Sequence, residues 1–211
     1  MPTPAFTTIL LVRHGVTATT GQVLPGRAPG LHLSEKGHAQ AGDVAQRLVE
    51  LSPRPVALYA SPLERTRETA APIAKALTIA PRLDKGLLEC DFGEWTAKRL
   101  SVLRKKPQWR SVQNTPSTFR FPGGESFVEM QARVWTTLER LAAKHRRETI
   151  VVVSHADPIK AAVTFALGVP LDLFQRTVIS TCSVSAIVLG DAGPFVLSVN
   201  NTGSLSELRP S

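Results

Sequence analysis

The run Thr149–Ser154 constrains the fold of this chain most. Its β-branched and apolar residues (TIVVVS) do not alternate with polar ones, which is the pattern of a strand covered on both faces. Two further apolar runs, Thr8–Val12 and Val56–Ala60, also have the character of buried strands. Strands buried on both faces occur mainly in parallel sheets flanked by helices. The sequence therefore predicts an α/β protein with a mostly parallel sheet.

Amphipathic helices are predicted between these runs. Ser34 has the position of an N-cap, and apolar residues follow it at helical spacing as far as Leu51. Ser126 and Glu129 form a capping-box pattern ahead of a second apolar helix face that ends at Leu141.

Other elements are predicted with less regular patterns. A helix should follow Ser61, with Pro72 kinking or restarting it. Another helix should follow His155, with Asp157 as its cap. Three weaker strands are expected at Thr78–Leu83, Val184–Leu189 and Phe195–Val199.

Composition indicates one globular domain. Of the 211 residues, 43% are hydrophobic and 20% are charged, and we find no repeat or linker, so a single domain over residues 1–211 is expected. Cys90 and Cys182 are too few for a disulfide framework and are expected to be buried thiols. The first apolar run is interrupted at Arg13 and lacks a basic segment before it, so we expect no signal peptide or membrane span, and a cytoplasmic location.

The positive charge is unevenly distributed. The formal net charge is +8, and residues 96–124 contain no Asp or Glu, so they are predicted to form a basic, lid-like insertion. One interpretation is a solvated lid helix whose charges aid solubility; another is a cover over the mouth of the site that concentrates an anionic substrate. Its cations are Lys98, Arg99, Arg104, Lys105, Lys106, Arg110 and Arg120.

Polar residues follow the three apolar runs directly. They are the triplet RHG at 13–15, the stretch 61–67 and the pair at 154–155. The carboxyl ends of parallel strands lie along one edge of the sheet, where α/β proteins place their chemistry. We therefore expect two imidazoles and at least one guanidinium to meet there.

These groups suit phosphoryl transfer. A neutral His14 can attack phosphorus and form a phosphohistidine. Arg13 and Arg65 can hold the phosphoryl oxygens with planar, permanently charged guanidiniums. His155 can donate a hydrogen bond to the same group beside the backbone amide of Ala156.

The leaving oxygen needs a proton, and Glu89 is the best donor. A carboxyl among its apolar neighbours would have a raised pKa. Asp91 and Glu94 compete with it but are more typical of surface carboxylates. Arg67 competes with Arg65 for the phosphate, and its other interpretation is a solvated helix face. Three other histidines have no supporting motif and are predicted on the surface: His32, His38 and His145.

Five blocks of the sequence resemble the histidine phosphatase superfamily, also called phosphoglycerate-mutase-like. They are RHG at 13–15, SPLERTRETA at 61–70, LxExxFGxW at 87–95, PGGES at 122–126 and VSH at 153–155. Their order and spacing agree with that family over nearly the whole chain. The resemblance implies a three-layer α/β/α fold with a central, mostly parallel sheet flanked by helices, and no required metal or other cofactor.

The resemblance also implies roles for the candidate residues. His14 would be the phosphorylated nucleophile, with Arg13, Arg65 and His155 as the phosphate pocket. Glu89 would be the general acid and then the base that activates water.

The chain departs from the family pattern at three positions. Thr20 stands where the family often has an Asn that contacts phosphate, and Ala156 and Asp157 stand where two glycines commonly follow the second histidine. Thr20 and Ala156 are still expected to bind substrate. Asp157 either caps a helix or repels an anionic substrate.

The predicted function is that of a metal-independent phosphatase acting on a small phosphorylated metabolite. A phosphomutase of the phosphoglycerate mutase type is the first alternative, although such an enzyme must shield its phosphohistidine from water, which a shorter chain does less well. The second alternative is a non-catalytic member of the fold that binds an anion or nucleic acid. The presence of Glu89 beside the two histidines argues against it, because a binding protein needs no acid at the phosphate. No membrane partner is expected, and a homodimer is left open, as are phosphoglycerates, sugar phosphates and ribazole phosphate as substrates.

Overall fold

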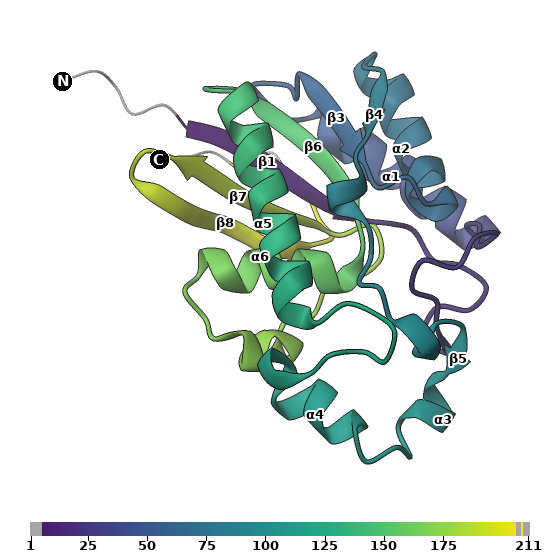
Figure 1. Ribbon diagram of the computed structural model, residues 1–211. Coiled ribbons are helices and arrows are strands. Elements are labelled where there is room, and N and C mark those ends of the chain that lie inside the picture. Colours follow the sequence, from purple (N-terminus) through teal and green to yellow (C-terminus); the bar gives the residue numbers. More distant parts are fainter. Residues whose placement is uncertain (1–5, 206–207, 209–211) are drawn as a thin grey trace.

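A six-stranded sheet with the strand order β4-β3-β6-β1-β7-β8 forms the centre of the molecule (Figure 1). The computed structural model describes residues 6–205 and 208. The parallel strands are β1 (Phe6–Arg13), β3 (Ala57–Ala60), β4 (Pro81–Leu83) and β6 (Thr149–Ser154), and β7 (Val184–Gly190) and β8 (Gly193–Asn201) extend the sheet in antiparallel pairing. The predicted mostly parallel sheet is confirmed.

Helices cover both faces of this sheet. One face carries α1 (Glu35–Val49) and α2 (Glu64–Leu77), and the other carries α5 (Phe127–Lys144) and α6 (Ala156–Ala166). Along β1, Ile9 and Leu11 join the core under α5 and α6, and Leu10 and Val12 join the core under α1 and α2. Both faces of β1 are thus buried, which explains the unalternating run and confirms the three-layer fold.

Short elements continue the chain beyond the carboxyl edge of the sheet. The pair β2 (Val23–Leu24) and β5 (Lys98–Arg99) joins the loop after β1 to the basic segment 96–124. Aromatic rings anchor that segment, because Trp95 packs against Phe119 and Phe121 at centroid distances of 5.5 Å. The remaining short helices are η1 (Lys85–Leu87), η2 (Gly93–Trp95), α3 (Leu100–Leu103), α4 (Trp109–Asn114), η3 (Pro116–Thr118) and η4 (Leu171–Arg176).

Both predicted N-caps are present. The Ser34 side chain accepts a hydrogen bond from the backbone N–H of Gly37 at the start of α1. Ser126 and Glu129 form the complete capping box of α5. Cys90 and Cys182 are free and buried, as predicted, and no helix in the described part of the chain is long and apolar enough to cross a membrane.

Three local predictions differ from the structure in detail. Pro72 lies inside a continuous α2, where burial of Ala70 and Ile73 against the core favours one helix over two. Asp157 is not the cap of α6, because that helix begins directly after β6 and places Asp157 in its first turn. The edge strand starts at Pro81, because Thr78 ends α2 in the left-handed region with φ of 57°.

Candidate active site

Three strand ends meet at the carboxyl edge of the sheet, as predicted. β3, β6 and β1 are neighbours in the sheet. The backbone N–H of His14 donates to the carbonyl of Ser154 and that of Ser61 donates to the carbonyl of Val153, both at 3.0 Å. The rings of His14 and His155 consequently lie with their centroids 5.3 Å apart.

The surroundings of His14 favour a neutral imidazole with its proton on Nδ1. Burial, with Arg65 and Arg13 nearby, lowers its pKa well below the usual range. Nδ1 lies 2.8 Å from the carbonyl oxygen of Gly15, which can only accept a hydrogen bond, so Nδ1 carries the proton. The lone pair is therefore on Nε2, and a neutral imidazole can act as a nucleophile through such a lone pair.

His155 is fully buried and contacts Ser61. Burial and the nearby Arg65 lower the pKa of His155 well below its usual range. Its Nε2 lies 2.8 Å from the hydroxyl oxygen of Ser61, whereas Nδ1 has no hydrogen-bond partner in the described part of the chain. A Ser61 hydroxyl that donates to Nε2 leaves a proton on Nδ1, which can then donate to a ligand.

Arg13 and Arg65 are anchored by backbone carbonyls rather than by carboxylates. Arg13 donates to the carbonyl of Ile179 at 2.6 Å, and Arg65 donates to that of Gly26 at 2.8 Å. Burial lowers the pKa of both arginines while Glu89 opposes the shift, and a guanidinium stays charged in such surroundings.

Buried donors without a partner are concentrated at this edge. Within residues 6–205 and 208 they are Nε of Arg13, Nε and Nη1 of Arg65, and Nδ1 of His155. An unsatisfied buried donor costs about 1–3 kcal/mol, and more when charged. Such a set is suited to an anion with several acceptor oxygens, and phosphate provides them.

Glu89 lies on the loop after η1 with a buried side chain. Burial raises the pKa of its carboxyl to about 7, and Asp157 adds to the rise while Arg65 and Arg13 oppose it. Its Oε1 accepts a hydrogen bond from the backbone N–H of Cys90 at 2.9 Å. A group with this pKa can both give and take a proton near neutrality.

The other predicted residues lie in different surroundings. The hydroxyl of Thr20 forms a hydrogen bond with the hydroxyl of Thr17 at 2.9 Å and accepts another from the backbone N–H of Thr17 at 2.8 Å. Thr20 therefore closes a turn within the loop. Ala156 is the first residue of α6, next to His155. Arg67 and Glu94 are exposed as predicted.

The prediction for the three remaining histidines was right for two of them. His32 and His38 are exposed, but His145 is buried and bridges Tyr59 to Glu148 at 2.9 and 2.7 Å. Its position at the C-terminus of α5 brings it against β3, which a local pattern does not reveal.

Several residues around the site were missed by sequence reasoning. Ser61 is the first residue after β3, so its position at a strand end was the available signal. Arg27 and Arg133 donate to backbone carbonyls of the Glu89 loop, and Glu125 binds both arginines. Ser61 and Glu125 stood in two of the quoted blocks, SPLERTRETA and PGGES, whereas Arg27 and Arg133 stood in none.

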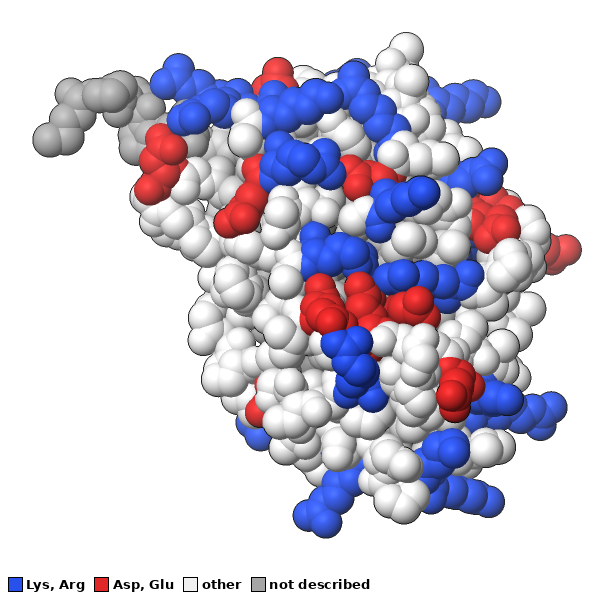
Figure 2. Space-filling view, in the orientation of Figure 1, with Lys and Arg blue, Asp and Glu red and all other residues white. Residues whose placement is uncertain are grey.

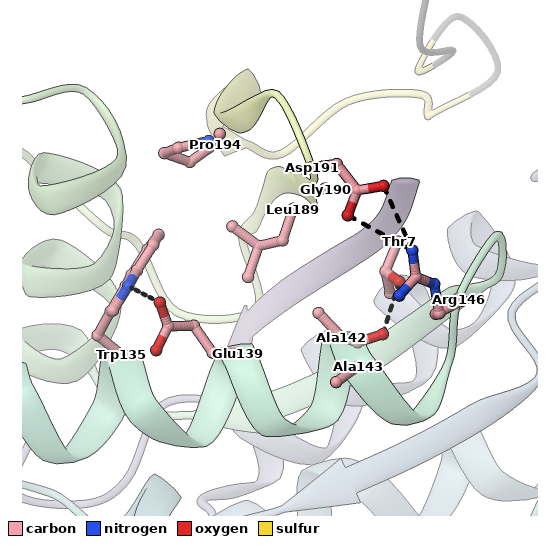
Figure 3. Close-up of a pocket in the computed structure, with 11 residues that line it drawn as sticks. Thr7, Trp135, Glu139, Ala142, Ala143, Arg146, Leu189, Gly190, Asp191 and Pro194 are labelled. Atoms are coloured by element: carbon pink, nitrogen blue, oxygen red, sulfur yellow. Dashed lines mark hydrogen bonds and ion pairs between the residues drawn. The ribbon is translucent and has the colours of Figure 1, made fainter. Parts of the chain in front are cut away.

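A separate cavity of about 250 Å³ lies at the opposite edge of the sheet (Figure 3). It is between α5 and the turn that joins β7 to β8, near the start of β1, whereas His14 follows the end of β1. Its polar groups are paired with one another: Trp135 donates to Glu139 at 2.8 Å, and Arg146 lies 3.3 Å from Asp191. Among the described residues, no buried donor without a partner lines this cavity, in contrast to the edge that carries His14.

Comparisons with known proteins agree with this geometry. A family model described as the histidine phosphatase superfamily, branch 1, matches residues 9–202. Phosphoserine phosphatase 1 of Hydrogenobacter thermophilus is 34% identical over 205 residues, which cover 94% of each chain. A probable phosphoglycerate mutase of Erwinia tasmaniensis is 32% identical over 182 residues, covering 85% of this chain and 83% of that protein. Among solved structures, a phosphoserine phosphatase mutant of Entamoeba histolytica in complex with phosphoserine has a TM-score of 0.84 at 24% identity, covering 94% of this chain and 99% of that one.

Proposed function

The chain belongs to the histidine phosphatase superfamily, and we propose that it hydrolyses a small phosphorylated metabolite through a phosphohistidine at His14. The observation that carries this proposal is the set of buried, unpartnered donors on Arg13, Arg65 and His155 beside a neutral imidazole. The two guanidiniums supply the positive charge that phosphoryl transfer requires, so the proposed reaction is metal-independent.

The first step forms the phosphohistidine. Nε2 of His14 attacks phosphorus as the bond to the leaving oxygen breaks, and the carboxyl of Glu89 gives its proton to that oxygen. Arg13, Arg65 and Nδ1 of His155 hold the other phosphoryl oxygens.

The second step returns the enzyme to its starting state. The Glu89 carboxylate takes a proton from water, the water oxygen attacks phosphorus, and the bond between phosphorus and His14 breaks. Inorganic phosphate, neutral His14 and protonated Glu89 result.

A substrate panel in the presence of a chelator tests the function. Phosphoserine, 3-phosphoglycerate, sugar phosphates and 4-nitrophenyl phosphate should release inorganic phosphate, with one of the metabolites preferred. Isomerisation of 3-phosphoglycerate faster than its hydrolysis would instead identify a phosphomutase, the activity that the relative from Erwinia tasmaniensis is named for. Failure to hydrolyse any member would contradict the proposal.

Inorganic phosphate should stabilise the protein through Arg65. At a phosphate concentration 100 times its Kd, the free energy of unfolding rises by about 2.7 kcal/mol, which corresponds to a Tm increase of roughly 5–10 °C for a chain of this size. Arg65→Met should abolish the increase, because it removes a guanidinium whose Nε and Nη1 have no hydrogen-bond partner. The apolar Met side chain should be tolerated at this fully buried position.

Differential scanning fluorimetry with phosphate, against chloride at equal ionic strength, measures this effect. The exposed Arg67→Met, on the same helix, is the matched control and should keep the full phosphate response. A response retained by Arg65→Met would contradict the assignment of Arg65 to the phosphate pocket.

Asp157→Asn should lower the pKa of Glu89, because the Asp157 carboxylate helps to raise it. Glu89 acts as an acid only when protonated, so the alkaline limb of kcat/KM should move to lower pH. The pH profile of aryl phosphate hydrolysis measures the shift, with Asp191→Asn at the exposed β7–β8 turn as control. An alkaline limb at unchanged pH would show that Asp157 does not raise the pKa of Glu89.

We propose that the basic segment 96–124 attracts the anionic substrate. Lys and Arg side chains project from the lower end of the molecule, over α3 and α4 (Figure 2). Replacing Lys105, Lys106 and Arg110 by Gln should weaken the salt dependence of kcat/KM, because long-range attraction is screened by salt. An unchanged kcat/KM at low ionic strength would contradict this role.

The proposed location is the cytoplasm. Cys90 and Cys182 are both free, which fits a reducing compartment. The expected partner is a small phosphorylated molecule rather than nucleic acid.

A further inference from the structure

We propose that Glu125 is a positioning residue for the acid–base step, since with Arg133 and Arg27 it fixes the loop that carries Glu89. This inference rests on the proposed function, because it concerns proton transfer by Glu89. Glu125 lies in the turn before α5, and Arg133 lies two turns into that helix.

Arg133 holds the Glu89 loop by its backbone. Its Nη1 donates to the carbonyls of Gly86 and Leu88 at 2.8 and 2.9 Å, and its Nη2 donates to the carbonyl of Glu89 at 3.4 Å. A planar guanidinium can span several carbonyls at once, whereas a lysine ammonium is a single point. The loop is thereby fastened to the long helix α5.

Glu125 orients Arg133 and joins it to a second arginine. Oε1 accepts from Nε of Arg133 at 2.7 Å, and Oε2 accepts from Nη2 of Arg133 and Nη2 of Arg27, both at 2.9 Å. Oε2 also accepts from the backbone N–H of Asp91 at 3.1 Å, directly on the Glu89 loop. Burial raises the pKa of Glu125, but the hydrogen bonds from Arg133 help to lower it below its ordinary value, so Glu125, the hub that joins Arg133 and Arg27, is an ionised carboxylate.

Arg27 connects the same hub to the phosphate pocket. Its Nε donates to the carbonyl of Glu89 at 2.8 Å. The preceding residue, Gly26, accepts from Nη2 of Arg65 through its carbonyl at 2.8 Å. A Cβ at Gly26 would lie 3.1 Å from the ring of Phe92, so the loop segment that contains Gly26 and Arg27 packs closely on the Glu89 loop.

The hydrogen bonds that Arg133, Arg27 and Glu125 make to the Glu89 loop all reach backbone atoms, and none of them touches the Glu89 carboxyl oxygens. Glu125 therefore acts through the placement of Glu89 and not on the substrate. In Glu125→Gln, an NH₂ donor replaces one acceptor oxygen and faces the donors of Arg133 or Arg27, so part of the hub is broken.

The test compares two substrates of similar shape, 4-nitrophenyl phosphate and phenyl phosphate. Nitrophenolate leaves readily without a proton, whereas phenolate, a stronger base, depends more on a proton from the acid. kcat/KM covers the steps up to departure of the phenol, so the ratio of the two kcat/KM values reports on the acid and is independent of the folded fraction. In Glu125→Gln the ratio of nitrophenyl to phenyl should rise roughly tenfold.

Glu129→Gln is the matched control. Glu129 also pairs with an arginine, Arg120, but is exposed, and Gln serves in a capping box as well as Glu does. Its ratio should equal that of the wild type. Arg133→Lys is the second variant and should raise the ratio in the same direction as Glu125→Gln.

The outcomes separate the inference from the function beneath it. A wild type inactive on both substrates would overturn the proposed function itself. An active wild type with variants that lose both activities equally, or lose neither, would overturn the positioning role and leave a purely structural one.

Discussion

His14→Ala is expected to reduce phosphomonoester hydrolysis by roughly 10⁴-fold or more, since removal of a covalent nucleophile leaves only the binding groups of the site. The effect should appear in kcat, because the bond-forming atom is lost while the phosphate-binding donors remain. Stopped assays of phosphate release with 4-nitrophenyl phosphate in chelator measure the loss.

The variant carries its own control for folding. Arg13, Arg65 and His155 are still present in His14→Ala, so added phosphate should still raise its Tm. Activity that survives the substitution would rule out His14 as the nucleophile, whereas loss of the phosphate response would indicate a damaged pocket.

Glu89→Gln is expected to lower kcat/KM for phenyl phosphate by roughly 10²–10⁴-fold. The wild-type kcat/KM should fall as the pH rises through about 7, where the carboxyl of Glu89 loses its proton. Gln cannot titrate, so the variant should lose this alkaline limb. It also lacks a base for water, so 4-nitrophenyl phosphate should give a burst of nitrophenolate followed by slow turnover.

Rapid-mixing kinetics and a pH profile measure both effects. Asp91→Asn is a suitable comparison, since Asp91 is on the same loop but has a side chain that is 41% exposed. An alkaline limb that persists in Glu89→Gln would assign the acid to another group.

The framework of the site could be predicted from the sequence because its determinants are local. Unalternating apolar runs specify strands buried on both faces, and the residues that follow them must lie at one edge of a parallel sheet. His14 and His155 could be chosen on that basis, and the apolar neighbours of Glu89 indicated it as the acid. The family pattern favoured Arg65 over Arg67.

Features that depend on tertiary packing could not be predicted in this way. Pro72 was expected to kink or restart the helix after Ser61, but α2 does not restart there, because its buried face favours one continuous helix. His145 has no local signal for burial, since Tyr59 and the end of α5 come together only in the fold. Arg133 donates to backbone carbonyls. Every residue has a backbone carbonyl, so the sequence of the loop does not indicate which of them an arginine binds.

The covalent phosphohistidine is tested most directly by mass spectrometry of the enzyme quenched in alkali during turnover of 4-nitrophenyl phosphate. We expect an intact mass increased by one phosphoryl group, mapped to His14, more abundant in Glu89→Gln and absent from His14→Ala. Turnover in Glu89→Gln with no phosphoryl group on the protein, or with the group on another residue, would contradict it.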